Sequence, residues 1–309
     1  MKTYVGVTDF DWFNYLSSID NIDEVNFWQP GGNTIFRALE PGELFLFKLH
    51  SPQNYIVGGG FFAHSTVLPV SLAWNSFERK NGATSLIEMR KRIEKYRRSS
   101  PSIEDYSIGC ILLEQPFFFP NEQWIPAPVD WSLNIVRGKR YFMDTEIGRD
   151  LWEQVQFRLQ AYKPVDQPQS EIREPAARFG APILVTPRLG QGSFRVIVTD
   201  VYNRRCAVTQ EKTLPALEAA HIKPFSDSGP HSVQNGILLR SDIHRLFDSG
   251  YVTVTSDYRF EVSRRIKDEF ENGRDYYALQ GRSLSTPNEP RMKPSREFIS
   301  WHNENVYRG

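Results

Sequence analysis

The chain has 309 residues with 37 basic and 37 acidic side chains, so its formal net charge is zero. Hydrophobic residues make up 40% and charged residues 24%, values that exclude a disordered or collagen-like chain and fit a globular protein with packed cores. No apolar run approaches the ~20 residues that span a bilayer. The acidic, polar N-terminus is also unlike a signal peptide. We therefore expect no membrane partner.

Two cysteines, Cys110 and Cys206, are too few for a disulfide framework or a four-cysteine zinc site. The sequence therefore predicts a reducing, cytoplasmic location. Zero net charge excludes a protein that coats nucleic acid by bulk electrostatics, but it leaves room for a local basic surface.

The two halves of the chain differ in composition. Residues 1–160 carry 16 basic and 19 acidic side chains and six of the seven tryptophans, whereas residues 161–309 carry 21 basic and 18 acidic side chains and four of the six histidines. The segment 163–171 between them is polar, holds two prolines and lacks apolar periodicity, which is typical of a linker. We predict domains at 1–162 and 181–309, joined by a linker over 163–180.

The first domain mixes strand and helix patterns. Short apolar runs at 43–48, 55–58 and 107–113 predict strands. Helical spacing of apolar residues predicts helices over 85–98 and 151–162. The sequence therefore predicts an α+β protein.

The helix predicted over 85–98 has one apolar face, running from Leu86 to Tyr96, and basic residues on its other faces. Arg90, Arg92 and Lys95 are candidate contacts for DNA phosphates. A solvated helix face with no ligand is the alternative interpretation.

The second domain opens with a helical pattern from Phe194 to about Asn203. Further along, apolar runs predict a strand over 217–222, a strand over 236–239 and a helix over 241–247, which together form a ββα unit. By propensity alone, the residues 217–220 could equally be helical.

Three polar residues occur within this unit, in the order His221, Asn235 and His244. Phosphodiester hydrolysis needs a general base for water, a cation to stabilise developing charge, and a group that fixes the base. His221 is a suitable base near neutral pH, and the Asn235 amide can brace the loop or the strand by hydrogen bonding. His244 and an acidic oxygen, such as that of Asp248 four residues later, can form a metal site.

The segment from about 188 to 301 resembles the HNH endonuclease family, in the branch found in modification-dependent restriction enzymes. The elements that carry the resemblance are RLGQGSFR, YNRRCAVTQ, LEAAHIKP, NGILLRSDIHRLFDSGY, ENGRDYYAL and WHNENVY. The resemblance implies a ββα-metal nuclease fold. It also implies that His221 is the general base, Asn235 the central asparagine and His244 the metal-binding histidine.

The sequence departs from common HNH patterns beside the base, where Ala220 replaces an acidic residue or histidine. Glu218 would share the strand face of Ala220, so Glu218 or Asp248 is expected to complete the metal site with His244. One histidine with carboxylates and water favours Mg²⁺ or Mn²⁺. Cys206 lacks the partner cysteines of zinc-stabilised HNH domains and is expected in the core.

The segments PGELFLF from Pro41 and IVGGGFF from Ile56 resemble the barrels of the PUA superfamily, in particular its EVE-like group. The resemblance implies an N-terminal β-barrel with helices that holds a modified base in an aromatic pocket. Phe27, Trp28 and Trp74 are the candidate pocket residues. Trp28 is favoured because the loop we expect there could present its ring to a ligand, and ordinary core packing is the alternative for each tryptophan.

Together these features predict a modification-dependent restriction endonuclease that acts on double-stranded DNA carrying 5-hydroxymethylcytosine or 5-methylcytosine. One nuclease site facing two strands predicts a homodimer or sequential nicking. Two alternatives stay open: a reader of modified nucleic acid whose HNH portion is not catalytic, which Ala220 favours, and a nuclease without selectivity for modification.

Overall fold

The computed structural model describes residues 2–31, 35–97, 105–132, 134–161 and 189–309. The chain divides into two compact units, Met1–Pro187 and Arg188–Gly309. The predicted linker over 163–180 and the predicted start of the second domain at 181 lie outside the described residues, so these boundaries stay predictions.

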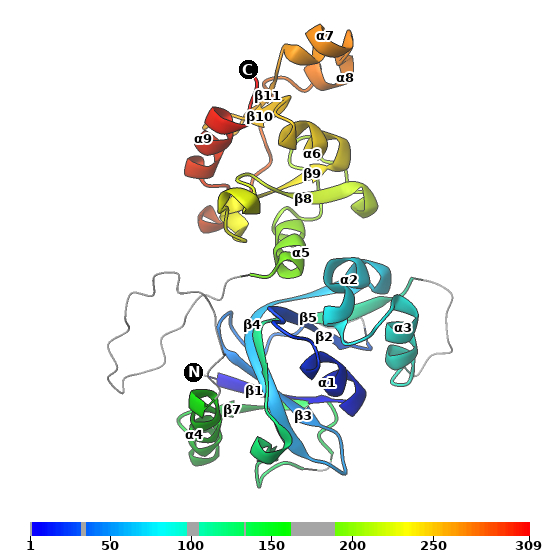
Figure 1. Ribbon diagram of the computed structural model, residues 1–309, viewed down its shortest axis with the longest axis vertical. Helices are drawn as coiled ribbons and strands as arrows, with labels where there is room; N and C mark the ends of the chain where they lie inside the picture. The colour runs from blue at the N-terminus through cyan, green and yellow to red at the C-terminus, as the bar shows by residue number, and fades with distance from the viewer. Residues whose placement is uncertain (1, 32–34, 98–104, 133, 162–188) are drawn as a thin grey trace. The chain divides into compact units, whose positions relative to one another are not determined.

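The N-terminal unit is built on one mixed sheet (Figure 1). Its strands are β1 (Lys2–Thr8), β2 (Glu24–Gln29), β3 (Leu44–Leu49), β4 (Tyr55–Pro69), β5 (Ser107–Phe118), β6 (Ile125–Pro126) and β7 (Gly138–Phe142). They pair in the order β2-β5-β4-β3-β1-β7, and β6 pairs with β4. The β1–β3 pair is parallel and the other pairs are antiparallel.

The α+β class is confirmed, but the predicted β-barrel is wrong. A barrel closes when its two edge strands hydrogen-bond to each other. Here β2 and β7 stand at opposite ends of the pairing order and do not pair within the described part of the chain, so the sheet is open. The edge strand β7 contacts the helix α4 (Glu146–Ala161) instead (Figure 1).

Three more α-helices complete the described N-terminal unit: α1 (Phe10–Ser17), α2 (Val70–Phe77) and α3 (Leu86–Glu94). Side-chain caps start two of them: Asp9 accepts a hydrogen bond from the backbone N–H of Trp12, and Ser85 accepts one from that of Glu88. Among the described helices of the whole chain, none is long and apolar enough to cross a membrane.

The sheet of the N-terminal unit carries an aromatic core. The Trp12 ring packs edge-on against Phe27 and Phe47, with centroids 5.4 and 5.1 Å away. Gly82 lies against the same indole with φ +79°, and a Cβ there would stand 2.1 Å from Trp12. Both the backbone conformation and the close approach therefore require glycine at this position.

The C-terminal unit consists of short elements around a second core. They are α5 (Gln191–Val201), β8 (Leu217–His221), β9 (Gly236–Arg240), α6 (Ser241–Asp248), β10 (Val252–Val254), β11 (Phe260–Val262), α7 (Arg265–Phe270), α8 (Arg274–Tyr277) and α9 (Arg296–Asn305). The predicted strand–strand–helix unit is confirmed in β8, β9 and α6, and the helical alternative for 217–220 is wrong because this segment pairs with β9.

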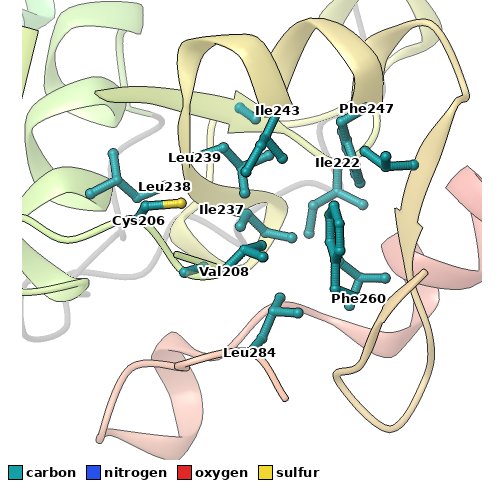
Figure 2. Packing of buried hydrophobic residues seen from close by; sticks show 14 of the residues in the cluster. Cys206, Val208, Ile222, Ile237, Leu238, Leu239, Ile243, Phe247, Phe260 and Leu284 are labelled. Carbon is teal, nitrogen blue, oxygen red and sulfur yellow. The ribbon is translucent and has the colours of Figure 1, made fainter. Parts of the chain in front are cut away.

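Figure 2 shows the core that supports this unit. Ile243 and Phe247 share one face of α6 because they are four residues apart, and both belong to the same buried cluster as Ile237 and Leu239 of β9. Cys206 is buried in the same core with a free thiol, as expected from the sequence. The apolar face of α6 fixes the helix and thereby directs its polar residues.

Candidate functional site

The β8–β9 pair and α6 bring the three predicted residues into one region. His221 is the last residue of β8, Asn235 directly precedes β9, and His244 lies in the middle of α6. The strand register pairs His221 with Gly236, and the Ile222 N–H donates to the Asn235 carbonyl at 2.9 Å. The local hairpin therefore sets the spacing between the base candidate and the central asparagine.

Asn235 is fully buried and holds the loop that connects the two strands. Its side-chain oxygen accepts from the Lys223 N–H, and its amide group donates to the carbonyls of Lys223 and Pro230, each at 2.9 Å. A buried amide with three hydrogen bonds fixes the loop at both ends. Asn235 therefore stabilises the segment that follows His221.

The imidazole of His221 is held on two sides. Its ring stacks on the buried Phe194, with centroids 3.9 Å apart and planes 11° apart, and its Nε2 lies 2.9 Å from Nδ1 of His231. Burial, together with the neighbouring His231 and His244, lowers the pKa of His221 to about 4. His221 is therefore neutral at pH 7 and able to accept a proton.

His231 is a residue that the sequence interpretation missed. It lies in the loop between β8 and β9, between His221 and the exposed ring of Phe225, on which it stacks at 4.7 Å with planes 8° apart. The only sequence signal was the excess of histidine in the second half of the chain. Loop residues have no period that would place them beside a site, so the contact needs the folded structure.

His244 lies between two carboxylates, one at each ring nitrogen. Glu218 Oε2 is 2.6 Å from Nδ1, and Asp248 Oδ2 is 3.3 Å from Nε2. Asp248 reaches the ring because it follows His244 by four residues on α6. Burial raises the pKa of the Asp248 carboxyl, His244 opposes this shift, and Glu218 adds to it.

These positions fit a cation site with few protein ligands. If His244 bound a metal ion through Nε2, Asp248 would be the carboxylate beside it, while Glu218 would accept the Nδ1 proton and orient the ring. No group of three or more His, Cys, Asp or Glu side chains that could hold a metal ion occurs among the described residues, and the expected site of His244 with Glu218 or Asp248 stays a prediction. A nitrogen, a carboxylate and several water or phosphate oxygens suit Mg²⁺ or Mn²⁺.

The N-terminal unit contains a cavity of about 410 Å³, within the usual range for ligand pockets. It lies where β1 ends and α1 begins, beside β2 and the end of α3. Its lining combines aromatic and polar side chains with backbone: Val7, Thr8, Asp9, Trp12, Phe27, Trp28, Gln29, Pro30, Gly31, His50, Tyr96, Val136 and Arg137.

Two of the three predicted pocket residues line this cavity. Phe27 and Trp28 do so from β2, not from a loop as we expected, and the Trp28 indole N–H donates to the Asn81 carbonyl at 3.0 Å. Trp74 lies on α2 and is not part of the lining. Trp28 therefore lines the cavity as a buried residue of the edge strand β2.

The polar part of the cavity was not predicted. His50 and Tyr96 stack with centroids 5.7 Å apart and planes 7° apart, and Asp9 stands near both. Burial lowers the pKa of His50, an effect that Asp9 opposes, and burial raises the pKa of Tyr96, an effect to which Asp9 adds. Asp9 and Arg137 therefore bring a carboxylate and a guanidinium to the lining of an aromatic cavity.

The three predicted phosphate contacts, Arg90 and Arg92 of α3 and Lys95 directly after it, have partners within the N-terminal unit. Arg92 donates to the Gly82 carbonyl at 2.6 Å and forms an ion pair with Glu88. Arg90 lies 3.6 Å from Asp105. Lys95, with 62% of its side chain exposed, is 3.7 Å from an equally exposed carboxylate on α1. Of the three predicted phosphate contacts, Lys95 is the freest to turn toward DNA.

Comparison with known proteins gives one family. Residues 206–255 match the HNH endonuclease family, whereas no curated protein matches the chain. Solved structures similar to it include ASCH from Zymomonas mobilis, at 10% identity and a TM-score of 0.32, covering 49% of this chain and 94% of that one. The modification-dependent TagI restriction endonuclease matches at 13% identity and a TM-score of 0.28, covering 97% of this chain and 81% of that one. The C-terminal unit thus contains an HNH endonuclease domain.

Proposed function

We propose that the protein is a modification-dependent DNA endonuclease, in which the N-terminal unit binds a modified cytosine and the HNH domain hydrolyses a phosphodiester bond. The observation that carries the proposal is the pairing of a neutral, doubly held His221 with the Glu218–His244–Asp248 group on one ββα unit. Metal-dependent hydrolysis of a phosphodiester needs at least a general base and a cation site beside it, and this unit offers a candidate for each.

In the hydrolytic step, His221 takes a proton from a water molecule, and the resulting hydroxide attacks the phosphorus atom while the bond to the leaving oxygen breaks. The low pKa of His221 keeps the imidazole unprotonated before the step. Asn235 keeps the loop beside the base in place, and Glu218 keeps the His244 ring turned. A divalent cation at His244 and Asp248 would supply positive charge for the phosphate oxygens and the leaving oxygen.

The cavity of the N-terminal unit has the groups that a flipped cytosine requires. Its aromatic wall suits stacking, which contributes roughly 1–3 kcal/mol per base and offsets part of the unstacking cost. The Asp9 carboxylate is an acceptor for the cytosine amino group, and the Arg137 guanidinium is a donor for its ring carbonyl. A thymine or uracil would turn a carbonyl toward Asp9 and be disfavoured.

The substrate of this proposal is double-stranded DNA. A single ββα site faces one strand at a time, so complete cleavage requires either a homodimer or two successive nicks. Size-exclusion chromatography with light scattering, run with and without modified duplex, distinguishes the two routes.

Cleavage of a duplex panel tests the proposal. The duplexes differ only in one cytosine, which is unmodified, 5-methylated or 5-hydroxymethylated, and each is incubated with Mg²⁺, Mn²⁺ or EDTA. We expect metal-dependent cleavage of at least one modified duplex and little of the unmodified one. The matched control is His221→Ala, which keeps the N-terminal cavity intact.

The outcomes separate the two halves of the proposal. Equal cutting of every duplex would contradict selectivity and leave a general nuclease. Selective binding without any metal-dependent cleavage would contradict the nuclease role and leave a reader of modified DNA, the alternative that Ala220 beside the base favours.

A further inference from the structure

A row of rings leads from the core to the surface, from α5 and the end of β8 into the loop between β8 and β9. It runs from the buried Phe194 through His221 and His231 to Phe225, whose side chain is 66% exposed. Stacking joins the rings at each end, and a hydrogen bond joins the two imidazoles in the middle. Such a row constrains the orientation of His221 and, through the hydrogen bond, the position of its proton.

We propose that His231 is a positioning residue that selects the tautomer of His221, and that Phe225 holds His231 in place for this role. The inference rests on the proposed nuclease function. It adds that His231 determines which nitrogen of His221 is left unprotonated to accept the proton from water.

The single proton shared by the two rings determines whether His221 can act as a base. A hydrogen bond between Nε2 of His221 and Nδ1 of His231 contains one proton. If His231 donated it, a neutral His221 would carry its own proton on Nδ1, and neither nitrogen could accept another. If His221 donates, its Nδ1 is bare, and among the described residues this atom has no hydrogen-bond partner. Only the second arrangement gives a base.

Proton transfer strengthens the same contact. When Nδ1 of His221 accepts a proton from water, the ring becomes a cation whose Nε2–H still points at the lone pair of His231. Hydrogen bonds from a charged donor are shorter and stronger than neutral ones. His231 therefore stabilises the protonated base at the moment when it forms, provided that His231 itself is neutral.

Asn235 extends this arrangement into the backbone. Its amide donates to the carbonyl of Pro230, the residue directly before His231, and the Ser232 N–H donates to the same carbonyl at 2.9 Å. The segment that carries His231 is thus fixed from the inside by Asn235, and its ring is covered from the outside by Phe225.

Two substitutions at position 231 separate hydrogen bonding from packing. His231→Asn keeps an acceptor near the place of Nδ1 but loses the ring, whereas His231→Phe keeps a ring to stack on Phe225 but has no acceptor. On the modified duplex that the wild type cuts best, we expect His231→Phe to lower kcat on the order of 100-fold with KM nearly unchanged. His231→Asn is expected to recover most of this loss.

Nitrogen-15 NMR of the full-length protein provides a readout apart from activity. We expect His221 of the wild type to carry its proton on Nε2, and His231→Phe to give a mixture of tautomers. Phe225→Ala should lower kcat less than His231→Phe, and it should have no further effect when combined with it, because both act through one contact.

Several results would overturn the inference. Equal activity of the Phe and Asn variants, or a wild-type His221 protonated on Nδ1, would remove the role of His231 while leaving His221 as the base. If the wild type cuts no DNA, the proposed function fails, and the tautomer spectra still decide whether His231 fixes His221. Circular dichroism of each variant identifies any that does not fold.

Discussion

The two units obtain their candidate sites in different ways. In the C-terminal unit, the residues of the site fall within 217–248, on one hairpin and the helix that follows it. In the N-terminal unit, the cavity is lined by residues from Val7 to Arg137, from strands, helices and connecting segments far apart in the chain. The first site is a local polar network, and the second is an aromatic cavity assembled by the whole sheet.

This difference indicates how the two sites respond to change. The polar network couples two of the catalytic candidates to the fold, since Asn235 is hydrogen-bonded to the loop backbone and His221 stacks on the core residue Phe194. Two polar residues that line the cavity are exposed, Tyr96 at 44% and Arg137. Substitutions at these exposed residues can therefore change which base the cavity recognises and leave the catalytic candidates of the ββα unit unchanged.

The largest expected effect is the loss of cleavage in His221→Ala. Removal of a general base costs typically 10²- to 10⁴-fold in rate, and His221 is the best-placed neutral base of the ββα unit. Binding of modified DNA should persist, because the cavity lies in the other unit. Single-turnover cleavage and fluorescence anisotropy measure the two properties on the same sample.

Loss of cleavage with retained binding would show that recognition and hydrolysis belong to different units. Full cleavage by His221→Ala would show that another group acts as the base. Loss of both cleavage and binding in a folded variant would contradict the separation of recognition from chemistry. Asp9→Asn provides the converse control, with binding impaired and the ββα unit unchanged.

The second prediction concerns the acid stability of the C-terminal unit. His302 is 1% exposed, with hydrogen bonds to Thr253 and to the Phe247 carbonyl, and burial lowers its pKa to about 4. The unfolded chain binds a proton near pH 6.5, so this stabilisation is complete above pH 6.5 and is lost as the pH falls toward 4. At about 1.4 kcal/mol per pH unit, the loss at pH 4 is about 3 kcal/mol.

Calorimetry from pH 7 to pH 4 measures this effect in the full chain. We expect His302→Gln to flatten the acid dependence of the transition that belongs to the C-terminal unit and to leave the other transition unchanged. A variant with the same acid dependence as the wild type would mean that His302 is not held neutral by burial. Comparison of slopes keeps the test valid even if the variant is less stable at every pH.

The same contrast explains which features the sequence predicts. The ββα unit follows from apolar runs and from three polar residues in order, because a hairpin and the next helix bring nearby residues together. The boundaries 217–222, 236–239 and 241–247 differ from β8, β9 and α6 by one residue at most. The α+β class follows from the same patterns.

Features that depend on distant contacts escape this reasoning. Asp9 caps α1 and Tyr96 ends the apolar face of the helix predicted over 85–98, and only the folded sheet brings both to one cavity. The open sheet likewise depends on which edge strands meet, a property that no single segment encodes. His231 lies in a loop whose path is set by the buried amide of Asn235.

The third prediction tests the cavity through Asp9→Asn. Asparagine keeps the side-chain oxygen that caps α1, so the fold should survive. It replaces the other carboxylate oxygen with a donor, which would face the amino group of cytosine. We expect modified-cytosine DNA to bind about 10-fold more weakly and discrimination against a thymine at the same position to decrease, since one such contact contributes about 1–3 kcal/mol. Anisotropy titrations with the two duplexes measure both effects.

The smallest expected effect distinguishes Lys95 from Arg92. The Lys95–Asp11 pair is solvent-exposed and contributes about 0–1 kcal/mol to stability, so Lys95→Ala should fold normally. If Lys95 contacts a phosphate, the variant should bind every duplex a few-fold more weakly and reduce the slope of log K against log salt by about one. Arg92→Ala should mainly destabilise the N-terminal unit, because Arg92 bridges Gly82 and Glu88. An unchanged salt slope for Lys95→Ala would leave α3 as a solvated helix face, with recognition confined to the cavity.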